Sequence, residues 1–88
     1  GNMRPKFAAR NLKVAGNPRI VGNGNHIRFR VKQERTSFPA IGFNLSEHYE
    51  DLINASSVDL AFVVEVNEWR GKSTIQLNVR DIKQVYST

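Results

Sequence analysis

The sequence predicts a small, mainly β domain: a five-stranded barrel with one helix between the third and the fourth strand. Its 88 residues allow a single domain with one modest hydrophobic core. Strands are indicated most clearly by "HIRFRVKQ" (residues 26–33), where apolar side chains alternate with basic ones, the period of a half-buried strand. A helix is indicated by residues 45–55, where the apolar spacing changes to that of one helical face.

Three strands are predicted in the first half of the chain. Residues 11–16, "NLKVAG", form a strand that ends at a glycine. Residues 17–25 are rich in Gly, Asn and Pro and predict a loop before the strand at 26–33. Residues 37–44 predict a third strand, in which Pro39 indicates a sheet edge or a bulge.

The helix and two further strands follow. Four apolar side chains share the predicted helical face: Leu45, Tyr49, Leu52 and Ile53. Ser46 is the predicted N-cap of this helix. Residues 58–66 and 74–82 predict the fourth and fifth strands. On the fifth strand we expect two faces, with Ile75, Leu77 and Val79 inward and Gln76, Asn78 and Arg80 outward.

This order of elements is that of the OB-fold, a small Greek-key barrel whose closure removes exposed sheet edges. The main alternative is an α+β domain with a split sheet, and an SH3-like barrel is disfavoured because it usually lacks a full helix at this place. We expect the barrel at residues 7–86, a tag remnant or linker at 1–6 and a tail at 87–88. The first residues are "GNM", so we expect a domain cut from a longer protein.

Charge is segregated along the chain. The net charge is +5, with balances of +8 over residues 1–36, −6 over 37–68 and +3 over 69–88. A segregated basic surface predicts a polyanionic partner, nucleic acid first and a membrane surface second, although such charges can also serve solubility alone. The longest apolar run, "LAFVV", is far shorter than the roughly 20 residues of a membrane span, so we expect no membrane partner.

The residues of an enzyme or a metal site cannot be assembled from this sequence. There is no cysteine, and neither His26 nor His48 has a second ligand at metal-binding spacing. No phosphate-binding loop of the G-x-x-x-x-G-K-[ST] type is present. We therefore expect no catalytic residues and no cofactor in this chain. The lack of cysteine and of a secretory signal favours a cytoplasmic protein.

Basic residues gather where a barrel of this kind binds its ligands. The ligand face is the outer side of strands two and three, flanked by the loops between strands one and two and between strands four and five. A positive groove with aromatic side chains is what single-stranded nucleic acid requires. The predicted contacts are Lys13, Arg19, Arg28, Arg30, Lys32, Phe38, Trp69, Arg70, Lys72 and Arg80. An ordinary solvated face is the alternative for the basic side chains.

The two aromatic candidates each have an alternative. Trp69, the only tryptophan, lies among polar residues in "EVNEWRGKS", expected as the loop between strands four and five. It stacks on a base, folds back to cap the barrel, or does both, with one ring face supported by the hairpin and the other offered to a base. Phe38 is a contact if it shares an outward face of the third strand with Ala40 and Gly42, and otherwise packs in the core.

The sequence also resembles a known family. The segments "FAARNLKVAGNPRIVGNGNHIRFRVKQ", "AIGFN" and "VDLAFVVEVNEWRGKSTIQLNVRDI" resemble the OB-like domain of RecJ-type single-stranded-DNA-specific exonucleases, over about residues 7–82. The string "NEWRGK…IQL" is the most specific part. The resemblance implies an accessory module that holds single-stranded DNA for a 5′→3′ exonuclease. It also implies catalytic DHH-type domains, with manganese or magnesium, elsewhere in the parent protein.

A second function remains open. The same basic groove could dock an acidic peptide tail, such as that of a single-strand-binding protein, and composition does not separate the two functions. The expected partners are thus single-stranded DNA, the remaining domains of the parent exonuclease and, in the second case, a single-strand-binding protein.

Overall fold

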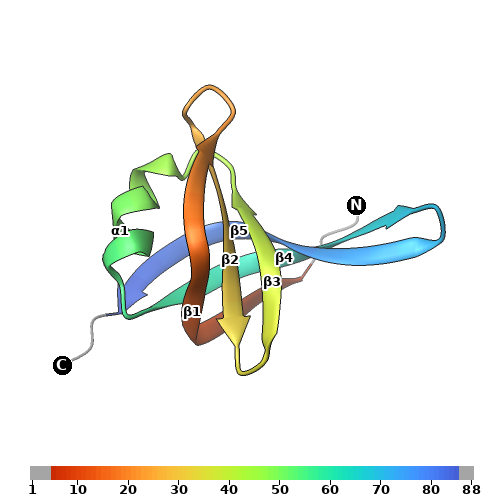
Figure 1. Cartoon of the computed structure of the whole chain (residues 1–88), viewed down its shortest axis with the longest axis horizontal. Coiled ribbons are helices and arrows are strands. Elements are labelled where there is room, and N and C mark those ends of the chain that lie inside the picture. Colours follow the sequence, from red (N-terminus) through yellow and green to blue (C-terminus); the bar gives the residue numbers. More distant parts are fainter. Residues whose placement is uncertain (1–4, 86–88) are drawn as a thin grey trace.

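The computed structural model describes residues 5–85 as a closed five-stranded barrel (Figure 1). Its strands are β1 (Lys6–Val21), β2 (His26–Gln33), β3 (Thr36–Gly42), β4 (Ser57–Trp69) and β5 (Lys72–Val85). They close in the order β1-β2-β3-β5-β4, with β3 and β5 parallel and all other neighbours antiparallel. A short 3₁₀ turn, η1 (Ser46–His48), and the helix α1 (Tyr49–Asn54) connect β3 to β4. The predicted fold class is confirmed. Residues 1–4 of the expected tag or linker and the expected tail at 87–88 lie outside the described residues.

Strand β1 is much longer than the sequence predicted. It spans 16 residues and pairs first with β4 and then with β2. The loop expected at residues 17–25 is wrong in its first half, because residues 17–21 continue β1 beyond a bulge between Ala15 and Arg19. Gly16 has a φ of +70° inside this bulge, a backbone conformation that favours glycine. The bulge therefore turns a Gly/Pro-rich segment into a bent strand rather than a loop.

The helical segment covers one end of the barrel. Leu52 of α1 is buried in the core, and Leu45 and Tyr49 pack against it, as predicted. Ile53 is half exposed, which corrects the prediction. The reason is η1: three residues at 3.0 rather than 3.6 per turn rotate the following helix by about 60°. The N-cap at Ser46 is also wrong, because no side chain caps either segment.

The core is mostly aliphatic and draws on every strand. Its buried residues are Leu12, Ile27, Phe29, Val31, Ala40, Leu52, Val58, Leu60, Leu77, Val79 and Ile82. None of the helices within residues 5–85 is long and apolar enough to pass through a membrane.

The β4–β5 hairpin projects beyond the barrel (Figure 1). Its ladder runs without interruption from Phe62↔Val79 to Trp69↔Lys72, whereas β3 meets β5 only at Ala40 and Ile41. The inward face of the hairpin therefore loses its cover toward the tip. Ile75 was predicted to face the core but is 46% exposed for this reason.

Candidate nucleic-acid interface

The basic face of β2 follows directly from its alternation. Ile27 and Val31 have no exposed surface, so the side chains between them point to the outside of the barrel. Arg28, Arg30 and Lys32 are all exposed there, as predicted.

Strand β1 adds positive charge to the same face. Arg19 lies directly opposite Arg28 in the β1–β2 ladder, and Lys13 lies opposite Lys32. Like charges at facing positions of an antiparallel pair destabilise a sheet. Within residues 5–85, none of these arginines forms an ion pair with a carboxylate. The facing basic residues lower the stability of the sheet and have no internal counter-charge, so an anion from outside the domain could neutralise them.

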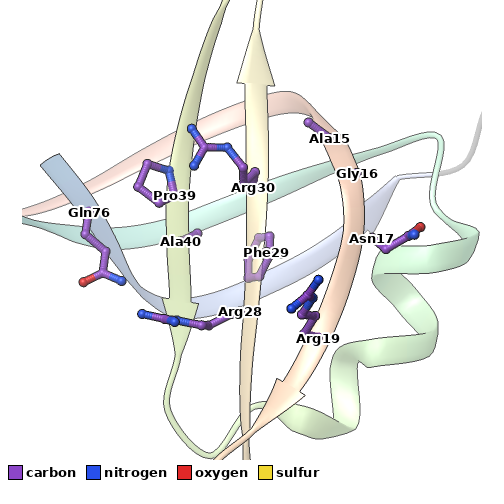
Figure 2. Close-up of a pocket in the computed structure, with 10 residues that line it drawn as sticks. All are labelled: Ala15, Gly16, Asn17, Arg19, Arg28, Phe29, Arg30, Pro39, Ala40 and Gln76. Carbon is purple, nitrogen blue, oxygen red and sulfur yellow. The ribbon is translucent and has the colours of Figure 1, made fainter. Parts of the chain in front are cut away.

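Three of the basic side chains, Arg19, Arg28 and Arg30, line a groove, which we call the arginine groove (Figure 2). It has a volume of about 370 Å³. Figure 2 shows Arg28 and Arg30 extending from β2 toward β3, with Arg19 between β1 and β2. The residues that line it are Ala15, Gly16, Asn17, Arg19, Arg28, Phe29, Arg30, Pro39, Ala40 and Gln76. Arg19 was expected in a loop; the β1 bulge instead places it on a strand, in register with Arg28.

Hydrogen bonds fix two of the basic side chains. The Nη2 of Arg30 donates to the Oγ of Ser37 at 3.1 Å, which holds the guanidinium over β3 and leaves its other donors available. The Nζ of Lys13 donates to the backbone oxygen of Ser56 at 3.1 Å. Lys13 therefore turns toward the α1–β4 connection and does not line the arginine groove.

Phe38 points the other way from the expected contact surface. It does share a face with Ala40 and Gly42, but both of these are buried, so this is the inward face of β3. Phe38 lies opposite Val31 and packs against the core. Of the two alternatives predicted for Phe38, core packing is the one found in the structure. The neighbouring residue Pro39 points outward. Pairing of β3 with β5 begins only at Ala40, so the sheet needs no hydrogen bond from Pro39 to β5.

Trp69 does not cap the barrel. Its side chain is 70% exposed at the end of the projecting hairpin. The guanidinium carbon of Arg70 lies 4.4 Å from the centre of the Trp69 ring, a cation–π contact that covers one face of the ring. The rest of the ring is free to contact a ligand.

The turn that follows Trp69 has an unusual residue in it. Arg70 and Gly71 have φ of 51° and 77°, the signs of a two-residue type I′ turn. Such turns favour Asn-Gly, and a left-handed arginine costs about 1–2 kcal/mol. In its place over Trp69, Arg70 makes a contact that an asparagine would not make.

The ladder relates the hairpin to the arginine groove. Trp69 pairs with Lys72, and pairs two residues apart, down to Glu65↔Gln76, lie on the same face. Gln76 lines the arginine groove. Trp69 and Lys72 therefore lie on the groove side of the hairpin, about 13 Å beyond Gln76 at 3.3 Å per residue.

The structure places Arg80 outside the arginine groove and brings Gln76 and Asn17 into it. Arg80 is exposed on β5, two residues past Asn78, where β5 last pairs with β3, and does not line the groove. Gln76 and Asn17 were missed as lining residues. Alternation marks Gln76 as outward, but only the β3–β5 pairing brings it beside β3 and into the groove, and that pairing has no local signal in the sequence.

The architecture and the groove define the class of protein. A closed five-stranded barrel with one helix between β3 and β4 is an OB-fold domain. The SSB domain of a Synechococcus sp. protein has the same fold, with a TM-score of 0.68 and 13% identity over 93% of this chain and 96% of that one. A small single-stranded DNA-binding protein from Streptomyces coelicolor superposes with a TM-score of 0.63 and 15% identity over 97% and 96% of the two chains.

The family is shown by sequence. The family model of the RecJ OB domain matches residues 1–81, and the chain belongs to this family. One relative is the single-stranded-DNA-specific exonuclease RecJ of Bacillus subtilis (strain 168), 24% identical over 80 residues. That match covers 91% of this chain and 10% of the relative, so the chain spans about a tenth of the exonuclease. The resemblance stated from the sequence is confirmed.

Proposed function

We propose that this domain binds single-stranded DNA in the arginine groove and along the groove side of the β4–β5 hairpin. The observation that carries the proposal is the facing pair of Arg19 and Arg28, which has no carboxylate partner within residues 5–85. The name of the RecJ relative and the fold of the two single-strand-binding neighbours support the same ligand.

The two parts of this surface suit the two parts of a nucleotide. Arginine offers a planar fork of N–H donors that matches the oxygens of a phosphate. The exposed ring of Trp69 offers a flat surface for a base, and base–aromatic stacking tolerates any sequence. Phosphates would lie over Arg19, Arg28 and Arg30, with Arg70 and Lys72 attracting the backbone beside the stacked base.

We also propose that the domain serves an exonuclease whose catalytic domains lie in other parts of a longer polypeptide. The tenfold greater length of the relative supports this proposal. Among residues 5–85 no group of three or more His, Cys, Asp or Glu is placed to hold a metal. We propose that those other domains hold the manganese or magnesium implied for the parent. The isolated domain is expected to leave a single-stranded oligonucleotide intact in the presence of manganese.

The salt dependence of oligonucleotide binding tests the proposal. Each phosphate contact contributes about −0.7 to the slope of log affinity against log salt, so three arginines predict a slope near −2. Anisotropy titrations of labelled dT12 at several salt concentrations measure it. Arg28→Ala and Arg30→Ala should each flatten the slope by about 0.7.

Arg10 supplies a matched control. It is exposed on β1 but lines a different depression, beside Asp59 and Asp81. Arg10→Ala removes the same charge and should leave the slope unchanged. No binding of dT12 at low salt, or equal flattening by Arg10→Ala, would contradict the proposal. Binding of an acidic peptide in competition with dT12, without any contribution from bases, would favour the docking function.

A further inference from the structure

A second exposed aromatic side chain, Phe43, lies on the barrel outside the lining of the arginine groove and outside the hairpin. Phe43 follows the last residue of β3 and is 50% exposed, although its ring is fully apolar. A phenylalanine held half in solvent at the end of a strand has surface available for a partner.

Phe43 lies on the same side of the sheet as the arginine groove. Ile27 and Gly42 face each other in the β2–β3 ladder and are both buried, so their neighbours His26 and Phe43 point outward. The two rings are in contact, with centroids 5.1 Å apart and an interplanar angle of 74°. Arg28 is two residues from His26 along β2, a separation of about 7 Å.

The ring of His26 is held in place beneath Phe43. Its Nδ1 accepts a hydrogen bond from the backbone N–H of Asn44 at 3.0 Å. Gly22 packs so closely that an added Cβ would come within 2.6 Å of the Cδ2 of His26. Gly22 also has a φ of +65°, which favours glycine at this turn. These contacts support Phe43 as a fixed ring rather than a loose side chain.

We infer that Phe43, supported by His26, is a second base-stacking platform, and that the arginine groove is bounded by an aromatic ring at each end. This inference rests on the proposed function. Phe43, one residue past the end of β3, lies four residues after Pro39, and Lys72 lies four residues before Gln76 on β5. Because β3 and β5 run parallel, these two segments extend in opposite directions. Each segment is about 13 Å long, about 26 Å together.

That separation defines the class of ligand. A strand stacked at 3.4 Å per nucleotide needs about eight nucleotides to extend from one ring to the other. The bases must be unpaired, because in a duplex their faces are already stacked on neighbouring bases and their edges are paired. The ligand is therefore an unpaired strand of about eight nucleotides or more, bound without a preferred sequence.

Substitution of Phe43 tests the inference. Phe43→Ala should weaken the binding of dT12 by roughly 5- to 150-fold, the range for loss of one stacked base. Phe43→Leu keeps an apolar side chain but no ring and should be weakened similarly, whereas Phe43→Trp should bind as well as the unmodified chain. Phe7→Ala is the control, because Phe7 is 48% exposed but lines an apolar cleft formed by the inward-facing side chains.

Strand length separates the inference from the function on which it rests. On dT12, Phe43→Ala and Trp69→Ala should each reduce affinity, whereas on dT4 each should have a far smaller effect, because a short strand can use the remaining ring. If Phe43→Leu binds dT12 normally while Arg28→Ala still flattens the salt slope, the second platform is wrong and the proposed function stands. If the unmodified chain binds no oligonucleotide, the proposed function itself is wrong.

Discussion

The outer face of β1–β3 and the β4–β5 hairpin are built in opposite ways. Under Arg28 and Arg30 lie Ile27, Phe29 and Val31, all buried, so the basic side chains project from a packed core. The hairpin has no such support beyond β3, and its tip carries an exposed Trp69 instead. The positions of the arginines are fixed by the core of the barrel, whereas those of the tip depend on the ladder and the turn alone.

Stability and binding should therefore depend on different residues. Substitutions beneath the arginine groove should mainly change folding, because each removes packed volume. Substitutions on the hairpin should mainly change binding, because little surface is buried there.

A matched pair of isoleucines tests the contrast most strongly. Ile27→Ala should lower the free energy of unfolding by about 2–5 kcal/mol, because Ile27 is fully buried. For a domain of this size, each kcal/mol lowers Tm by about 4–8 °C. Ile75→Ala removes the same atoms from an exposed site on the hairpin and should change Tm little. Equal losses from both variants would mean that the hairpin is packed in solution.

Trp69→Ala should have the reverse profile. The free energy of dT12 binding should fall by about 1–3 kcal/mol, because a stacking surface is lost. Tm should change by only a few degrees, since the ring buries little surface. Thermal melting and anisotropy titration of the same variant measure both quantities. A large drop in Tm with normal binding would restore a structural role for the ring.

Arg70 should separate stability from binding in the turn. Arg70→Asn places a residue suited to a type I′ turn at a φ of 51° and should raise stability by up to about 1 kcal/mol. The same change removes the guanidinium beside Trp69 and should weaken dT12 binding. Unchanged affinity, measured beside a chemical melt, would show that the cation–π contact has no part in binding.

Arg28→Gln tests the smallest effect. Removing one charge of the facing Arg19–Arg28 pair should stabilise the free domain by about 0.2–1 kcal/mol at low salt. The gain should shrink at high salt, where the repulsion is screened. Urea unfolding at two salt concentrations measures this. A loss of stability at low salt would mean that Arg28 is compensated within the domain.

Much of the fold was predictable because its signals are local. Strand β2 shows the period-two alternation in seven successive residues, from His26 to Lys32, and its predicted bounds agree with the structure. The extension of β1 was not predictable, because it depends on a bulge at Gly16 and on pairing with a strand far along the chain. The exposure of Ile75 depends on where the pairing of β3 with β5 stops, and no residue near Ile75 in the sequence indicates that point.

The candidate site was predictable in the charges of β2 and in Trp69, but not in its other aromatic residues. Alternation places Arg28 and Arg30 outward whatever the barrel closure. Phe38 kept two alternatives, contact or core, because only the β2–β3 register decides the direction of its face. Phe43 was missed because it lies past the end of a strand, where its direction is set by contact with His26.

The most direct test of the central claim is backbone amide chemical-shift mapping of the ¹⁵N-labelled domain with dT12. One continuous binding surface predicts that the amides of β2 from Arg28 to Lys32 and those of the hairpin from Glu68 to Lys72 shift together at a common midpoint. The amides around Arg10 and Lys83, in a separate depression, should stay in place. Shifts gathered around Arg10 and Lys83, or confined to the hairpin with β2 unaffected, would contradict a groove and hairpin that bind one strand.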